Sequence, residues 1–206
     1  MAEPSSEHPS GATNGPGRRP TTSRHELERA AFELFDRHGF EATTVDAIAR
    51  TAGVGRRTFF RYFDSKNDVV WGSFTEQLVL MREKFLACPD DQPLMEALRT
   101  VVVEFNRVDD PAEAARHRRR LELILQVPAL QAHSTLRYAE WRAIVVEFVA
   151  RRLGASTDAL VPQTVAYACL GAALAAYEQW LHQPEVELCD AIDTAMRHLA
   201  SGFAIG

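Results

Sequence analysis

The chain has 206 residues, of which 46% are hydrophobic, and it carries a net charge of −5 at pH 7. This length allows one or two domains with a sizeable core, and the acidic balance alone argues against a general nucleic-acid binder. Three scattered cysteines exclude a disulfide framework, so we expect reduced thiols. The sequence shows no apolar N-terminal signal segment, and its longest nearly apolar run, residues 165–177, is too short to cross a bilayer. We therefore expect a cytoplasmic protein without a membrane partner.

Charge is distributed unevenly along the chain. Residues 17–66 hold ten Lys and Arg against seven Asp and Glu, whereas residues 67–206 hold thirteen against nineteen. A basic N-terminal part on an acidic body is typical of a small DNA-reading domain attached to a larger regulatory domain.

Residues 1–20 are rich in Pro, Gly and Ser and lack apolar periodicity, which predicts a disordered tail. The tail ends in a basic pair, Arg18 and Arg19. Such a pair can enter the minor groove next to a DNA-binding domain, as homeodomain arms do. A solvated linker explains the same two residues equally well.

One long and two short helices are predicted after the tail. Apolar residues over 22–38 recur at the spacing of one helical face, and Gly39 follows as a stop signal. A second helix is predicted over 44–52 and a third over 55–63, with Gly53 turning the chain between them. An apolar helix, a turn with Gly and a basic helix fit the helix-turn-helix plan, in which the second helix enters the DNA major groove.

The segment 43–66, TTVDAIARTAGVGRRTFFRYFDSK, resembles the signature of the TetR family of transcriptional regulators. A threonine-led helix is followed by I-A-x-x-A-G-V, then by a basic helix that ends in Y-F, and S-K opens the next helix. The resemblance covers residues 18–85. With the helical pattern of the rest, it implies an all-α fold of about nine helices with an N-terminal three-helix domain and a C-terminal helical domain. We place the helix-turn-helix domain at 21–66, a linking helix at 67–87 and the ligand-binding and dimerisation domain at 88–206.

The reach of each side chain divides the candidate DNA contacts. Arg56 and Arg57 lie in the first turn of the third helix, where an arginine can bind guanine with two hydrogen bonds. Thr58 suits a phosphate or a thymine methyl group, and Arg61 the DNA backbone or solvent. The side chains suited to phosphates are Thr44, Tyr62 and Lys66.

Three positions depart from the family pattern. Gly55 stands where a serine N-cap is common, and Phe60 stands where a tyrosine commonly donates to a phosphate. Arg57 replaces a frequent glycine and adds a candidate base contact. Beyond the family level, GRRTFFRYFDSKNDVVWG resembles regulators encoded beside mycofactocin biosynthesis genes, which implies control of a redox-cofactor operon.

The body is predicted to be helical throughout. After a break at 88–91, apolar periodicity and turn signals predict five helices. Pro128 is expected to interrupt the chain before the third of them. The predicted helices cover residues 93–108, 110–126, 134–153, 162–182 and 185–203.

The last two helices are expected to form a homodimer interface. In the resembled family, two helices of each subunit form this contact, and small residues let helix backbones approach closely. The alternative is that they form only the core of the monomer. The small-sided positions are Ala166, Ala168, Gly171, Ala172, Ala173, Ala175 and Ala176.

A ligand site is expected among the middle helices. The candidates are apolar and aromatic with a few hydroxyl groups, which favours an elongated apolar ligand over a polyanion or a metal. Taken singly, most of them are better explained as ordinary core residues, and the prediction of a ligand site rests on the set as a whole. The candidate ligand-binding residues are Phe105, Leu125, Tyr138, Trp141, Val145, Phe148, Tyr167, Leu170, Leu174 and Tyr177.

A basic cluster, residues 116–120, lies within one predicted helix. We hypothesise that part of it, including Arg120, holds the phosphates of a long-chain acyl-CoA. The alternative is a solvated face paired with Glu113 and Glu122. No metal-ligand spacing occurs among the histidines, and we expect neither a metal nor a cofactor.

These patterns predict a ligand-responsive repressor that binds a palindromic operator in double-stranded DNA and is not an enzyme. The sequence lacks G-x-S-x-G, a phosphate-binding glycine loop and a metal motif. The main alternative is a helical interaction protein that has lost specific DNA binding, and an enzyme is the weakest alternative.

Overall fold

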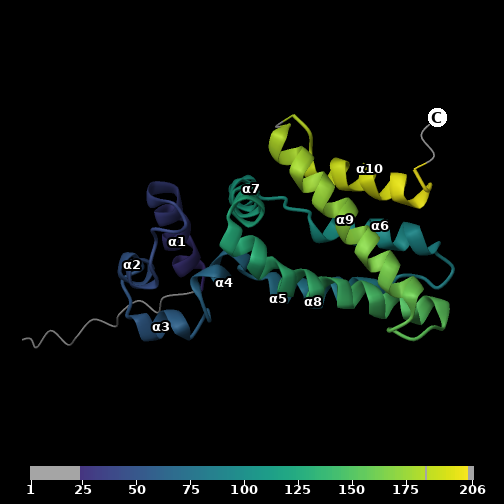
Figure 1. Ribbon diagram of the computed structural model, residues 1–206, viewed down its shortest axis with the longest axis horizontal. Helices are drawn as coiled ribbons and strands as arrows, with labels where there is room; N and C mark the ends of the chain where they lie inside the picture. The colour runs from purple at the N-terminus through teal and green to yellow at the C-terminus, as the bar shows by residue number, and fades with distance from the viewer. Residues whose placement is uncertain (1–23, 184, 204–206) are drawn as a thin grey trace, which may run out of the picture.

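The computed structural model describes residues 24–183 and 185–203, which form ten α-helices and no strand (Figure 1). The all-α prediction is confirmed. The count exceeds the expected nine because residues 67–87 form two helices instead of one. The predicted arm residues Arg18 and Arg19 lie outside the described residues.

The first three helices form a compact head: α1 (Arg24–His38), α2 (Val45–Thr51) and α3 (Arg56–Phe60). The Thr44 side chain caps α2 by accepting a hydrogen bond from the Ala47 amide at 3.1 Å. Gly53 turns the chain between α2 and α3 at a φ of 70°. The head core is aromatic and aliphatic, and includes Leu27, Phe35, Phe40, Ile48, Phe59 and Phe63.

The predicted linking helix is broken into α4 (Lys66–Trp71) and α5 (Phe74–Ala87). Ser65 caps α4, as its Oγ accepts from the Asp68 amide at 3.3 Å. Gly72 ends α4 with φ 54° and ψ −125°, a conformation that residues with a Cβ rarely adopt. Arg24 of α1 donates to the Gly72 carbonyl at 2.7 Å. The break therefore lies against the head. The sequence over 67–87 does not reveal it, because its apolar residues follow one continuous helical pattern.

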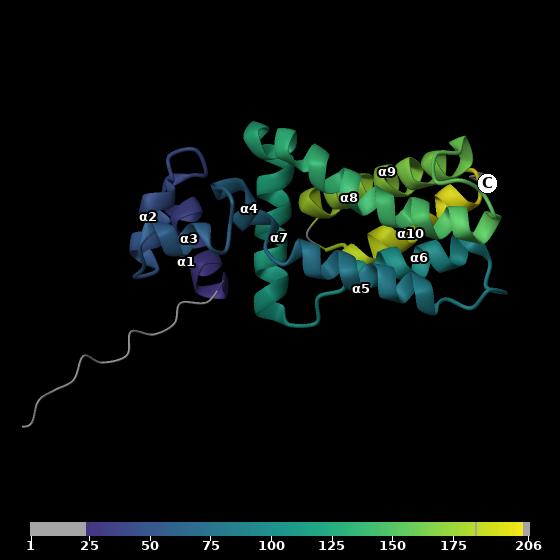
Figure 2. The ribbon, with the colours of Figure 1, turned by 90° about the horizontal axis from the view of Figure 1, so that it is seen from below.

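The body consists of α5 and five further helices. Helix α7 (Pro111–Gln126) ends and α8 (Pro128–Leu153) begins at Pro128, so the chain is interrupted there as expected. The predicted start of the next helix at residue 134 is wrong, because proline is tolerated in the first turn of a helix, where its missing N–H needs no partner. In Figure 2, α7 stands across the end of the body that faces the head. The remaining helices are α6 (Leu94–Phe105), α7 (Pro111–Gln126), α8 (Pro128–Leu153), α9 (Leu160–His182) and α10 (Leu188–Ala200).

Helix α9 packs against α8 and α10, and α10 packs against α6. Among the described helices, α9 alone could cross a membrane by length and composition, but here it lies between its neighbours in the body. On the other side, α5 packs against α6 and α8, where the Phe85 and Phe148 rings stack with centres 4.4 Å apart. The head meets the body through α4, which contacts α7 and α8. One end of the body thus lies directly behind the head.

Candidate nucleic-acid interface and ligand cavity

Helix α3 presents a basic face to solvent. Phe59 is fully buried and anchors the helix, which leaves Arg56 and Arg57 exposed and Thr58 half-buried. Arg56 approaches Asp46 of α2 at 3.3 Å, and its guanidinium lies 5.4 Å from the centre of the Phe60 ring. Within the described residues, Arg57 makes no hydrogen bond or ion pair, so its guanidinium can meet a base edge without breaking a contact.

The candidate phosphate contacts surround α3. The Arg61 guanidinium lies 3.2 Å from the Tyr62 hydroxyl, at the C-terminal end of the helix. The Lys66 ammonium donates to the Phe40 carbonyl at 2.6 Å and lies 4.2 Å from the centre of that ring. Burial lowers the pKa of Lys66. Lys66 thus joins α4 to the chain after α1, a role that depends on tertiary contacts and that sequence patterns do not reveal.

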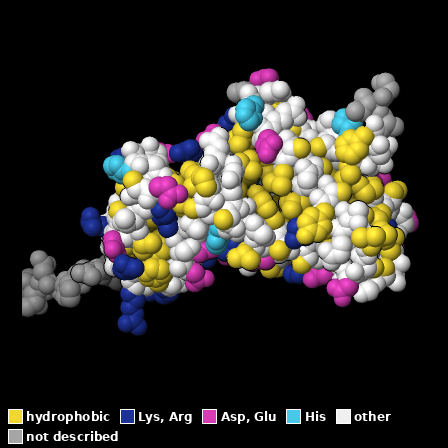
Figure 3. All heavy atoms as spheres, viewed as in Figure 1, with side chains coloured by type: hydrophobic (Ala, Val, Ile, Leu, Met, Phe, Trp, Pro, Cys, Tyr) yellow, Lys and Arg dark blue, Asp and Glu magenta, His cyan; other side chains and the backbone are white. Residues whose placement is uncertain are grey.

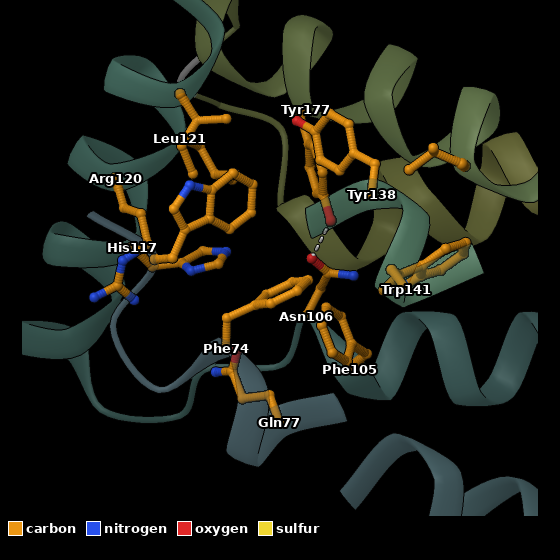
Figure 4. Close-up of a pocket in the computed structure, with 13 residues that line it drawn as sticks. Phe74, Gln77, Phe105, Asn106, His117, Arg120, Leu121, Tyr138, Trp141 and Tyr177 are labelled. Carbon is orange, nitrogen blue, oxygen red and sulfur yellow. Dashed lines mark hydrogen bonds between the residues drawn. The ribbon is translucent and has the colours of Figure 1, made fainter. Parts of the chain in front are cut away.

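A small cavity lies in the body next to the head (Figure 4). Its volume is about 60 Å³, and side chains from six helices, α4 to α9, surround it. Six of the eleven candidate ligand residues line it: Phe105, Arg120, Tyr138, Trp141, Leu170 and Tyr177.

The other five candidates, Leu125, Val145, Phe148, Tyr167 and Leu174, do not line this cavity. Phe148 stacks on Phe85, and Val145 is fully buried in the core. Tyr167 is 56% exposed, with the Arg142 guanidinium 3.8 Å from the centre of its ring. Helical periodicity marks a buried face, but it does not show which buried residues border a cavity.

Sequence patterns missed seven residues that line the cavity. Three of them come from the stretch expected to be a linking helix, because the break at Gly72 turns that stretch into the cavity wall. The Tyr177 hydroxyl donates to Asn106 Oδ1 at 2.6 Å, a buried polar pair that the sequence does not signal (Figure 4). The missed residues are Trp71, Phe74, Gln77, Asn106, His117, Leu121 and Ile124.

A wider cleft of about 610 Å³ lies between the head and the body. Gln77, His117 and Arg120 border both the cleft and the cavity, so the two spaces adjoin. The remaining cleft residues include four basic side chains and two carboxylates. They are Arg24, His25, Glu28, Ser73, Arg107, Val108, Glu113 and Arg116.

The basic cluster 116–120 divides into structural and cleft-facing residues. Arg118 donates to the Leu181 carbonyl at 2.9 Å, and Arg119 pairs with Asp36 of α1 at 2.7 Å. Arg116 faces the cleft and pairs with Glu113 at 2.7 Å. Arg118 and Arg119 therefore agree with the alternative to phosphate binding, because protein groups already bind their guanidinium groups.

Arg120 is the most buried arginine of this cluster and reaches the head. Its Nη2 lies 3.6 Å from Glu28 Oε2 of α1, and the two side chains are 15% and 9% exposed. Burial raises the pKa of Glu28, although the charges of Arg120 and Arg24 act in the opposite direction. This pair links the cavity wall directly to the head, and its desolvation opposes the attraction between the charges.

The opposite side of the body carries a third feature, an apolar groove between α9 and α10 with a volume of about 640 Å³. Small side chains of α9, including Ala168, Gly171, Ala172 and Ala175, line it. Phe203, which is 62% exposed, lies at the groove as well. In Figure 3, hydrophobic side chains gather over the body, whereas Lys and Arg side chains project from the head. No cluster of three metal-ligating side chains occurs within residues 24–183 and 185–203.

A basic helix-turn-helix head joined to a helical body with an internal cavity defines a one-component transcriptional regulator. The chain belongs to the TetR family: residues 28–70 match "Bacterial regulatory proteins, tetR family" and residues 92–204 match "MftR C-terminal domain". It is a ligand-responsive DNA-binding regulator and not an enzyme.

The chain is 44% identical over 187 residues to a Mycobacterium tuberculosis (strain ATCC 25618 / H37Rv) protein provisionally named mycofactocin biosynthesis transcriptional regulator MftR. The match covers 91% of this chain and 94% of the relative. The resemblance to the TetR family and to regulators encoded beside mycofactocin biosynthesis genes is thereby confirmed.

Two solved structures share the fold. The fatty acid degradation regulator FadR from Bacillus halodurans has a TM-score of 0.63 at 17% identity, over 92% of this chain and 100% of that chain. Thermus thermophilus FadR, solved in complex with lauroyl-CoA, has a TM-score of 0.56 at 22% identity, over 89% and 96%.

Proposed function

We propose that the protein is a cytoplasmic repressor that binds a palindromic operator as a homodimer and releases it when a long-chain acyl-CoA enters the body. The observation that carries this proposal is the apolar cavity that adjoins a basic cleft directly behind the head. The similarity to MftR supports a target operon for mycofactocin biosynthesis.

The dimer is supported by the groove between α9 and α10. Exposed apolar surface of this kind marks protein–protein contacts, and small residues allow close helix packing. A two-fold dimer would place two α3 helices in successive major grooves, roughly 34 Å apart or a multiple of that distance. Palindromic half-sites require this symmetry.

The acyl-CoA class is supported by the two adjoining spaces. The aromatic and aliphatic cavity wall matches the chemistry of an acyl chain, and the cleft beside Arg24, Arg107 and Arg116 matches that of phosphates. T. thermophilus FadR, which has the same fold, binds lauroyl-CoA, and this chain would use a comparable ligand.

The cavity is smaller than the roughly 300–1,000 Å³ of typical ligand sites, so a twelve-carbon chain enters only if the wall moves. The effector would therefore favour an open conformer over the compact one. If the open conformer holds the two heads at a spacing that misses the operator, a preference of about 100-fold supplies roughly 2.7 kcal/mol for release.

The dimer can be tested at Gly171, where an added Cβ meets no atom within 4 Å. Gly171→Glu should yield a folded monomer in analytical ultracentrifugation, whereas Gly171→Ala should remain a dimer. If Gly171→Glu is as dimeric as the wild type, the α9–α10 interface is wrong.

The effector class can be tested by isothermal titration of the full chain with lauroyl-CoA. We expect saturable binding of lauroyl-CoA and much weaker binding of free coenzyme A, which lacks the acyl chain. If lauroyl-CoA produces neither heat nor release of bound DNA, acyl-CoA is not the effector class.

A further inference from the structure

Three buried nitrogen atoms have no hydrogen-bond partner within the described residues: Trp71 Nε1, His117 Nε2 and Arg120 Nε. All three side chains line the cavity behind the head. Buried polar groups are nearly always paired, because an unpaired one loses its hydration without compensation. Three such atoms around one small space indicate a place for a ligand atom that pairs with them.

The chemistry of these nitrogens identifies the matching group. The indole of Trp71 and the guanidinium of Arg120 can only donate. Burial, together with the charge of Arg120, lowers the pKa of His117 to about 4, so its ring is neutral at pH 7 and carries one N–H. With that proton on Nε2, all three nitrogens donate. Since two of the three can only donate, an oxygen with two lone pairs fits here better than a cation.

The chain next to Trp71 lies against Arg120, since a Cβ at Gly72 would be 2.7 Å from Arg120 Nη2. The Trp71 ring packs edge-on against Phe74 and Tyr138, with centres 5.1 and 5.8 Å apart. His117 and Arg120 are three residues apart on α7 and lie on the same side of the cavity, away from Trp141 (Figure 4). An oxygen placed here would lie at the passage from the cleft into the apolar interior.

Arg120 also connects this side of the cavity to the DNA-binding head. Its guanidinium is held at 3.6 Å by Glu28 and lies 5.8 Å from the centre of the Phe32 ring, both on α1. A ligand oxygen that binds Arg120 would compete with the Glu28 carboxylate for the same cation. Binding in the cavity would then weaken a contact that holds the head in position.

We propose that Trp71, His117 and Arg120 form a subsite for a carbonyl or carboxylate oxygen of the effector, and that its occupation loosens the Arg120–Glu28 contact. This inference rests on the proposed function, since it assigns the polar group of the same effector. The oxygen can come from the thioester of an acyl-CoA or from the carboxylate of a free fatty acid. In both cases the apolar chain extends toward Trp141 and Leu170.

The subsite is tested with lauroyl-CoA and S-dodecyl-CoA, which differ only in the carbonyl oxygen, and with laurate, which lacks coenzyme A. Lauroyl-CoA, laurate and S-dodecyl-CoA, a thioether without the carbonyl, are titrated into the full-length protein. Trp71→Phe removes the indole N–H together with part of the ring, so its effect is judged by the difference between ligands. We expect it to weaken lauroyl-CoA or laurate about 5- to 50-fold more than S-dodecyl-CoA. Whichever of the first two loses affinity identifies the source of the oxygen.

Trp141→Phe makes the same substitution elsewhere in the cavity and is the matched control. It should not discriminate between the carbonyl ligand and the thioether. Both substitutions remove the same buried ring atoms and should lower the melting temperature without ligand. Trp71→Phe should lower it less than Trp141→Phe, because it also removes an unpaired buried donor. A larger drop for Trp71→Phe would indicate a purely structural role of Trp71.

The link to the head is tested with Glu28→Gln and its control Asp36→Asn, since Asp36 also pairs an α1 carboxylate with an α7 arginine. Glu28→Gln should tighten effector binding about 5-fold and weaken operator binding, because binding and release are reciprocal. Asp36→Asn should change neither, as Arg119 does not line the cavity.

Equal binding of lauroyl-CoA and S-dodecyl-CoA by the wild type, without loss of laurate in Trp71→Phe, overturns the subsite and leaves the acyl-CoA effector standing. Failure of all three ligands to bind overturns both. Identical behaviour of Glu28→Gln and Asp36→Asn overturns the coupling.

Discussion

Arg137 of α8 donates from Nη2 to Asp68 Oδ1 of α4 at 2.8 Å, and this contact ties the helix behind the head to the longest helix of the body. Ser65 donates to the same carboxylate at 2.6 Å, and His133 lies 3.1 Å from it. Burial raises the pKa of Asp68, but the hydrogen bonds from Ser65 and Arg137 outweigh it, and the pKa lies below the ordinary value. Asp68 is therefore an ionised carboxylate that joins α4, next to the head, to α8 of the body.

The first prediction concerns the contact between Asp68 and Arg137. Asp68→Ala and Arg137→Ala should each destabilise the protein, and a double-mutant cycle by urea unfolding should give a coupling of about 1–3 kcal/mol. Glu140→Ala serves as the control, because Glu140 pairs with Arg137 at 3.3 Å at a more exposed position and should cost less than about 1 kcal/mol. Additive effects within about 0.5 kcal/mol would show that the contact does not couple α4 to α8.

The second prediction separates base contacts from phosphate contacts. Arg57→Ala should relax specificity at one base pair, with a loss of about 1–3 kcal/mol on the operator and little change on random DNA. Lys66→Ala should weaken binding to all sequences and reduce the salt slope by about 1. Because Lys66 also bonds the Phe40 carbonyl, Lys66→Ala should lower head stability, whereas Arg57→Ala should not. Equal losses on operator and random DNA for Arg57→Ala would contradict a base contact.

The third prediction concerns the break between α4 and α5. A Cβ at Gly72 would lie 2.7 Å from Arg120 Nη2 and 3.3 Å from Glu28 Oε2, at a φ of 54°. Gly72→Ala should therefore cost about 1–3 kcal/mol in thermal or urea unfolding and should displace Arg120. Gly171→Ala, in an open position of α9, should be neutral or stabilising. A Gly72→Ala protein as stable as wild type would mean that the backbone there is not constrained.

The fourth prediction is a pH dependence. The pKa of His117 is lowered from 6.5 to about 4, so between these values the unfolded chain binds a proton that the folded protein does not. The contribution of His117 to the free energy of unfolding is therefore fully present above pH 6.5. It is lost on acidification and lowers that free energy by about 3 kcal/mol down to pH 4. His117→Gln should remove this contribution from urea unfolding curves measured between pH 4 and 7. The exposed His182→Gln is the control, and an unchanged pH slope in His117→Gln would refute the assignment.

The head could be predicted well because its signals are local. Caps such as Thr44 and turns such as Gly53 act over a few residues, and so do the apolar stripes of α1 and α2. The place of Arg57 in the first turn of α3 followed from the helix-turn-helix pattern. Sequence periodicity therefore gave the elements of the head and the basic face of α3.

The cavity could be predicted only in part, because it depends on the break at Gly72. Periodicity reads 66–87 as one helix, since Trp71 and Phe74 both look like core residues. The positive φ of Gly72 instead turns these residues into the cavity wall. Buried contacts such as Arg120–Glu28 join residues far apart in the chain, and no local pattern encodes them.

Release of operator DNA is the most direct test of the proposed acyl-CoA-responsive repressor. Fluorescence anisotropy with a labelled duplex from the region upstream of the protein's own gene measures binding at fixed salt, with random DNA as reference. We predict operator binding at least about 1,000-fold tighter than binding to random DNA, and release by lauroyl-CoA but not by free coenzyme A. Equal affinity for both duplexes, or operator binding that lauroyl-CoA leaves unchanged, would contradict an acyl-CoA-responsive repressor.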